Sequence, residues 1–164
     1  HNELLKRRPD LLEVLGQPFT YSRMGEEGPD QEPWFESPAF SYLDGRLSVC
    51  SGFNHIKKGH QLPGRTPLTE KQLEAYAFFE TICEELHFGA VFEPGDMPVL
   101  NSHVTLHART AFEDWPEPER RRHLWRMWLR VDGFHPRSPF FENYKDGIWV
   151  PNEARSITLE AWPA

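Results

Sequence analysis

Glycine and proline interrupt this chain so often that few long helices can form in it. The 164 residues contain 11 glycines and 15 prolines, together with 12 phenylalanines and six tryptophans. Glycine and proline end helices and form turns, whereas aromatic residues are enriched in strands. We therefore expect a single domain of strands joined by many loops, rather than a helical bundle.

One segment, residues 68–86, escapes this pattern and is expected to be a helix. Its sequence "LTEKQLEAYAFFETICEEL" begins with Thr69, and Gln72 follows three residues later, which is the spacing of a capping box. Apolar residues recur at helical spacing and predict one buried face, formed by Ala75, Phe79, Ile82 and Leu86.

The other elements are predicted to be short. Residues 1–16 indicate two helical pieces, and residues 18–23 a strand. The pair Asp44-Gly45 separates the alternating runs 38–43 and 46–50, which predicts a β-hairpin. Residues 87–109 and 120–131 are also expected to form strands, and the first is broken by a tight turn from Pro94 to Asp96.

Charge and composition argue against several classes of partner. The formal net charge of −7 disfavours a nucleic acid, and the basic run from Arg120 to Arg122 is short. The sequence has neither a signal-peptide pattern nor an apolar run of about 20 residues, the length that spans a bilayer. Cys50 and Cys83 are too few for a disulfide framework and are expected to be buried thiols. We therefore expect a cytoplasmic protein with no membrane contact.

The stretch "NSHVTLHARTAF" places His103 and His107 four residues apart. On a helix the two rings would lie about 6 Å apart and could share a metal ion. The intervening Val, Thr and Leu favour a strand, on which four residues span about 13 Å. The zinc-protease motif also requires Glu directly after the first histidine, where this chain has Val104. At most one of these histidines is therefore expected to bind a given metal.

Arg122 and Arg126 are also four residues apart, so on a strand they lie on one face, which they share with Leu124 and Trp128. Guanidinium groups on an apolar face require anions. Two sources remain open. Carboxylates of the protein could pair with them, or a dicarboxylate cosubstrate could do so while its other end chelates a metal.

The segment "EPGDMPVLNSHVTLHARTAFEDWPEPERRRHLWRMWLR" resembles the C-terminal half of the taurine dioxygenase (TauD/TfdA) family of iron(II)- and 2-oxoglutarate-dependent oxygenases. The upstream "RRPDLLEVLGQPF", the Asp-Gly hairpin and "LTEKQLEAY" are similar to the family in the same order. The resemblance implies a mostly β protein with some α structure, a double-stranded β-helix (jelly roll) with flanking helices. It further implies that O₂ oxidises a small organic substrate, usually by hydroxylation, while 2-oxoglutarate is converted to succinate and CO₂.

The resemblance also implies roles for individual residues. His107 matches the distal iron-binding histidine, and Arg122 matches the arginine that pairs with the far carboxylate of 2-oxoglutarate. Arg126 matches a position that meets an anionic group of the substrate. Arg109 belongs to the motif and is expected in a buried ion pair, whereas His103 occupies a variable position and is not an expected ligand.

In this family the other two iron ligands come from an H-x-D or H-x-E motif on an earlier strand. We expect that motif to lie upstream of this region, with none of the histidines present supplying it. Residues 1–164 are then the C-terminal part of a single oxygenase domain, completed by an N-terminal segment or a second copy. Two alternatives are a jelly roll that only binds or supports other molecules, and a cupin-like metal protein that does not use 2-oxoglutarate.

Overall fold

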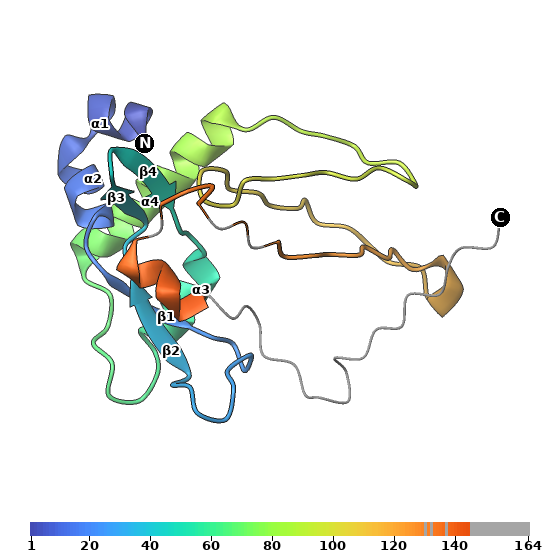
Figure 1. Ribbon diagram of the computed structural model, residues 1–164, viewed down its shortest axis with the longest axis horizontal. Helices are drawn as coiled ribbons and strands as arrows, with labels where there is room; N and C mark the ends of the chain where they lie inside the picture. The colour runs from blue at the N-terminus through green and yellow to red at the C-terminus, as the bar shows by residue number, and fades with distance from the viewer. Residues whose placement is uncertain (130, 132, 137, 145–164) are drawn as a thin grey trace.

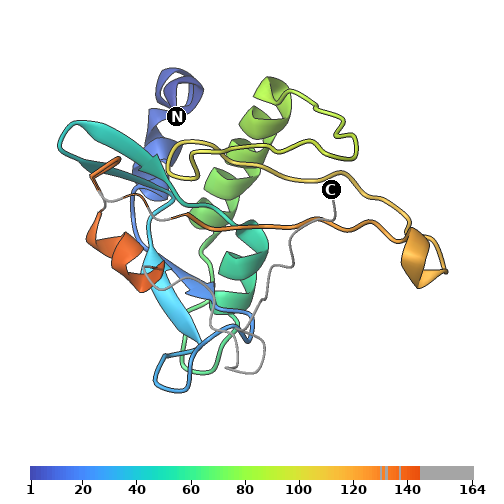
Figure 2. The same cartoon turned by 45° about the vertical axis from the view of Figure 1, so that its right-hand side comes forward.

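The computed structural model describes residues 1–129, 131, 133–136 and 138–144 (Figure 1). Residues 1–86 form a body of helices and strands, and residues 87–129 form an extended arm that leaves the body and returns to it (Figure 2). In chain order the elements are α1 (Asn2–Arg7), α2 (Pro9–Leu15), β1 (Phe19–Ser22), β2 (Trp34–Ser37), β3 (Phe40–Leu43), β4 (Arg46–Val49), α3 (Phe53–Gly59), α4 (Glu70–Leu86), η1 (Pro118–Arg120) and η2 (Pro139–Tyr144).

The strands of the body form two antiparallel ribbons, β1–β2 and β3–β4. The predicted hairpin is confirmed as β3–β4, and its turn residues Asp44 and Gly45 have φ values of 50° and 74°. Positive φ at both central positions is the requirement of the tight hairpin turn that Asp-Gly favours. Strand β2 was not predicted, because its pairing with β1 joins residues such as Tyr21 and Phe35 across a polar loop.

Helix α4 confirms the predicted helix and its capping box. The Thr69 side chain accepts a hydrogen bond from the Gln72 backbone N–H, and the Gln72 side chain accepts one from the Thr69 backbone N–H. Three of the four predicted face residues are buried, namely Ala75, Phe79 and Ile82. Leu86 is 63% exposed, so its predicted burial is wrong; it is the last residue of the helix.

The core of the body lies between α1, α2, α4 and the two ribbons. Tyr76 is at its centre, with its ring 5.0 Å from Phe19 and 4.9 Å from Phe53. Helix α3, which was not predicted, packs closely on β1, because a Cβ on Gly59 would lie 2.2 Å from the Thr20 carbonyl oxygen. Cys50 and Cys83 are free thiols and only partly buried.

The arm contradicts the predicted strands. No residue from 87 to 129 is in a strand, and most of its large apolar side chains are exposed. Leu124 and Trp128, expected beside Arg122 on an interior face, are 65% and 63% exposed. A strand needs hydrogen-bonding neighbours and cover for its apolar face. The rest of the described chain provides the arm with little of either, so the arm stays extended without forming a sheet.

The described residues therefore contain small antiparallel ribbons and helices, which are consistent with the predicted double-stranded β-helix but do not by themselves form it. Among the same residues, no helix combines the length and apolar character needed to cross a membrane.

Candidate functional site

A tight turn precedes His107. The Asn101 backbone oxygen accepts hydrogen bonds from the N–H groups of Val104 and Thr105 at 3.1 and 3.0 Å. The Asn101 side-chain oxygen accepts a further hydrogen bond from the His103 N–H at 3.1 Å. Asparagine favours such turns because its side chain hydrogen-bonds the backbone two residues on. His107 follows this turn on extended, exposed backbone.

The two histidines of the H-x-x-x-H pair have different surroundings. The ring of His103 is partly buried and stacks against His135, with the centroids 4.8 Å apart. His107 is exposed. Nowhere in the described ranges do three His, Cys, Asp or Glu side chains group as ligands for one metal ion.

Phe112 links the segment of His107 to Arg122. The guanidinium carbons of Arg109 and Arg122 each lie 5.2 Å from the centre of its ring. The backbone N–H of Arg122 also donates a hydrogen bond to the Asp114 carboxylate at 3.0 Å. These contacts bring the segment after His107 alongside Arg122, the last residue of the basic run. Sequence reasoning missed Phe112, because no short pattern in the sequence signals this contact.

The buried ion pair predicted for Arg109 is not found among the described residues, where Arg109 is exposed and its guanidinium lies over Phe112. Arg126 lies four residues beyond Arg122 and is exposed. Within the described residues the Arg126 side chain has no hydrogen bond, ion pair or ring contact, so the structure brings Arg122, but not Arg126, to the His107 segment.

The expectation that no histidine fits the H-x-E spacing is wrong, because His1, Asn2 and Glu3 match it. The structure gives these residues another role. Asn2 and Glu3 begin α1, rather than a strand. The two ring nitrogens of His1 are within hydrogen-bond distance of the Tyr42 hydroxyl, at 2.7 Å, and of the Asn2 side-chain oxygen, at 3.0 Å. His1 therefore fastens α1 to the β3–β4 hairpin.

A buried polar cluster lies in the body, where the Tyr21 hydroxyl donates to the Cys50 carbonyl oxygen at 2.8 Å and lies 3.4 Å from the Tyr76 hydroxyl. Burial raises the pKa of the Cys50 thiol and the pKa of the Tyr76 hydroxyl. Both groups are therefore protonated near neutral pH, and Cys50 has no thiolate character.

The donor set around His107 is compatible with part of an iron site. A solvent-accessible imidazole is a suitable ligand for iron(II), and iron(II) oxygenases use two histidines and one carboxylate on one face of the metal. The described residues offer one of these three donors at this place, His107, while the guanidinium of Arg122 lies over the ring of Phe112.

Comparison with known proteins gives a family match. Residues 1–128 match the model of the "Taurine catabolism dioxygenase TauD, TfdA family". The chain is 34% identical over 139 residues to FR-33289 synthase from Streptomyces rubellomurinus, covering 80% of this chain and 40% of the relative. It is 32% identical over 145 residues to the taurine hydroxylase-like protein SAT17 from Stachybotrys chartarum, covering 85% of this chain and 36% of the relative.

The chain thus spans only 40% and 36% of the lengths of these two curated relatives. Proteins of the matched family have a jelly-roll fold and are oxygenases that in general depend on iron(II) and 2-oxoglutarate. The match extends through the body and nearly all of the arm, including His107 and Arg122. On this basis the chain belongs to the TauD/TfdA family.

Proposed function

We propose that this chain is part of an iron(II)- and 2-oxoglutarate-dependent dioxygenase that oxidises, and usually hydroxylates, a small organic substrate with release of succinate and CO₂. Family membership supports the reaction class. The observation that carries the proposal is the contact of Arg109 and Arg122 with Phe112. Through Phe112 the segment that follows His107 lies beside Arg122, the proposed cosubstrate arginine.

His107 is the proposed iron ligand of this chain. An imidazole ligand must be neutral and must have a ring nitrogen that can reach the metal. His107 is exposed on extended backbone, so its ring is accessible from solvent. The bound iron, with 2-oxoglutarate and O₂, supplies the oxidising power of the reaction, and His107 contributes to holding it.

Arg122 is the proposed partner of the far carboxylate of 2-oxoglutarate. Its planar guanidinium can donate two parallel hydrogen bonds to a carboxylate. No carboxylate among the described residues forms an ion pair with Arg122; its guanidinium lies over Phe112, and its backbone N–H bonds Asp114. This arrangement favours an external carboxylate over the internal pairing that the sequence left open.

Arg126 is the proposed contact for an anionic substrate. Its guanidinium is exposed and unpaired within the described part of the chain. The matched family and one relative bear the name of taurine, a molecule that carries an anionic sulfonate group. An arginine suits such a group because it combines a permanent positive charge with several N–H donors.

The remaining iron ligands are proposed to come from polypeptide outside these 164 residues, either from the same protein or from a second copy. The domain proposed for residues 1–164 extends past residue 144 and thus partly outside the described residues. Cytoplasmic localisation is likewise part of the proposal.

Two arginine variants of the native full-length protein test this function. Arg122→Lys should raise the apparent KM for 2-oxoglutarate at an unchanged substrate KM, because a lysine cannot reproduce a bidentate grip. The loss is expected to be about 2–5 kcal/mol, the range for truncating one partner of a buried charge pair. Arg126→Lys should instead raise the KM of an anionic substrate. The measurement is a separate titration of cosubstrate and substrate with each variant.

Arg120→Lys is the matched control, because the Arg120 side chain is already held by Trp115 and Glu117. It should leave both titrations unchanged. Control of 2-oxoglutarate affinity by Arg126 would show that the assigned register is wrong by four residues. A native protein that does not consume 2-oxoglutarate would instead favour the binding protein or the cupin-like alternative.

A further inference from the structure

His103 is seated against two other parts of the chain. Its ring lies parallel to that of His135, with the centroids 4.8 Å apart and an interplanar angle of 9°. It also meets the ring of Phe141 edge-on at 5.3 Å. His135 is 8% exposed, and its Nε2 lies 2.9 Å from the hydroxyl oxygen of Ser48, on β4. The imidazole of His103 thus packs on a buried residue that is itself fastened to the body.

The backbone of His103 is attached to the same strand. The Val49 N–H, on β4, donates to the His103 carbonyl oxygen at 2.7 Å. Within the turn, the Asn101 side-chain oxygen accepts a hydrogen bond from the His103 N–H. Figures 1 and 2 show the yellow part of the arm returning to the body near β4. Ring and backbone contacts therefore hold residues 101–105 at one place.

We propose that His103 is a positioning residue, which fixes the turn of the arm from which the proposed iron ligand His107 extends. This inference rests on the proposed function of His107. A metal ligand must be held within about 0.5 Å of its productive position. His107 follows His103 by four residues, and the extended backbone after the turn begins where the turn is held.

The stacking geometry argues against His103 and His135 forming a metal site together. The lone pairs of an imidazole lie in the plane of its ring, whereas these two rings present their faces to each other. Parallel faces provide packing contact, as in other offset aromatic pairs. The stacking and edge-on contacts use the ring surface of His103, and a phenyl ring can reproduce these two contacts.

The test compares His103→Ala with His103→Phe in the native full-length protein. His103→Ala should weaken iron(II) affinity about tenfold and speed hydrogen exchange at the Val49 amide by a similar factor. The reason is that the loss of one aromatic pair of this kind changes an equilibrium constant about tenfold. His103→Phe should restore both values to near the native ones. Iron(II) affinity is measured by titration without turnover, and amide exchange by NMR or mass spectrometry.

Either of two results would overturn the proposal. If His103→Phe loses iron(II) as fully as His103→Ala, the nitrogen atoms of His103 are what matters. If His103→Ala changes neither readout, the ring holds nothing in place. Ile82→Ala is the stability control: Ile82 is buried in α4, so this variant should lower Tm but leave iron(II) affinity unchanged where the protein is folded.

His107→Ala separates this inference from the proposed function. It should abolish iron(II) binding while the Val49 amide keeps its native protection. Retained iron(II) binding in His107→Ala, or a native protein that binds no iron(II), would reject the proposed function. Hydrogen exchange at Val49 would then still decide whether His103 holds the turn.

Discussion

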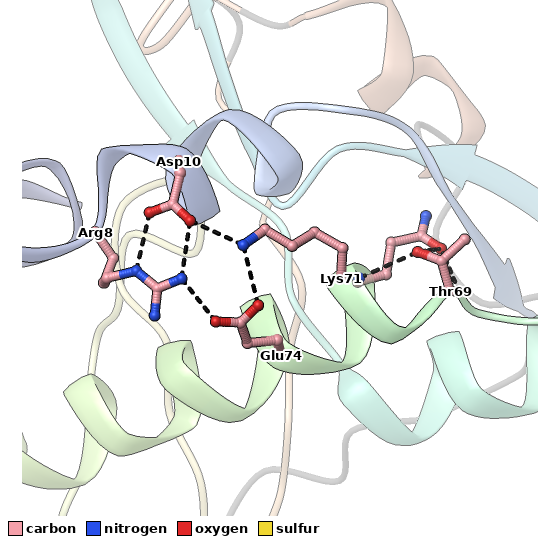
Figure 3. A network of polar contacts seen from close by, with 6 residues as sticks. Arg8, Asp10, Thr69, Lys71 and Glu74 are labelled. Carbon is pink, nitrogen blue, oxygen red and sulfur yellow. Dashed lines mark hydrogen bonds and ion pairs between the residues drawn. The ribbon is translucent and has the colours of Figure 1, made fainter.

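Four charged side chains join α2 to α4 on the surface of the body (Figure 3). Arg8 donates to both carboxylate oxygens of Asp10 at 2.9 and 2.8 Å, and to Glu74 at 2.6 Å. Lys71 bridges the same two carboxylates at 2.9 and 3.0 Å. Each acid thus faces two cations. Exposed pairs contribute little one at a time, and a closed network with a bidentate arginine is the arrangement in which they contribute most.

This network predicts a pH dependence of stability. The hydrogen bonds from Arg8, and then from Lys71, hold the pKa of Asp10 below its usual value, and the pKa of Glu74 is lowered by the same two partners. A carboxylate with a lowered folded pKa stabilises the protein above its unfolded pKa, about 4, and this stability is lost as the pH falls through the folded pKa. Asp10→Asn should therefore lower the free energy of unfolding at pH 7 and flatten its decline toward pH 2.

Urea unfolding at several pH values checks this expectation. Asp30→Asn is the control, because Asp30 is exposed in a loop and lies in no ion pair of the described chain. High salt should reduce the difference between Asp10→Asn and the native protein, since exposed charges are screened. If the free energy of unfolding falls as steeply at low pH in Asp10→Asn as in the native protein, the network does not have the role given to it.

At the scale of the element, the capping box makes a local prediction. Thr69→Ala removes the acceptor for the Gln72 N–H at the start of α4 and should destabilise the protein by about 1 kcal/mol. Thr81→Ala is the matched control within the same helix. The Thr81 hydroxyl only donates back to the Ala77 carbonyl, a bond that does not stabilise a helix. Urea unfolding of the two variants compares them, and equal losses would show that the cap contributes nothing specific.

The elements that sequence reasoning predicted are those with local signals. The β3–β4 turn follows from Asp44-Gly45, and the start of α4 follows from Thr69 and Gln72. Strand β2 and helix α3 were missed because they depend on distant residues. Tyr21 on β1 pairs with Phe35 on β2, and a polar loop separates the two residues in the sequence. Helix α3 can pack on β1 because Gly59 lacks a side chain.

The candidate site was predictable to a similar extent. The motif around His107 and Arg122 is local and led to the family that the comparison shows. The contact of both arginines with Phe112 depends on how the arm folds back, which no short pattern specifies. The stacking of His103 on His135 joins residues 32 positions apart, and it could not be predicted from the sequence either.

At the scale of the whole molecule, the body and the arm differ in how far their apolar side chains are buried. The body buries a core that includes Leu4, Leu11, Phe19, Ile56 and Tyr76, each at most 1% exposed. The arm leaves Phe88, Val91, Val99 and Trp125 between 83% and 93% exposed. Large apolar side chains in such a concentration are typical of a surface that binds another molecule, such as a protein or a ligand. The segments wrongly predicted as strands have the apolar composition of a sheet, and no strand pairs with them in a sheet among the described residues.

This contrast predicts how the 164-residue chain behaves when it is expressed alone. Amides of the body, such as those of α4, should exchange slowly, whereas amides from 87 to 100 and from 123 to 129 should exchange at nearly the rate of an unfolded chain. Iron(II) should bind weakly, because one imidazole cannot replace the three protein ligands of a complete site. Hydrogen exchange and an iron(II) titration of the isolated chain measure the two effects.

Tight, stoichiometric iron(II) binding would show that the chain contains a full ligand set. His1 and Glu3 would then be the first residues to replace, since they alone carry the H-x-E spacing.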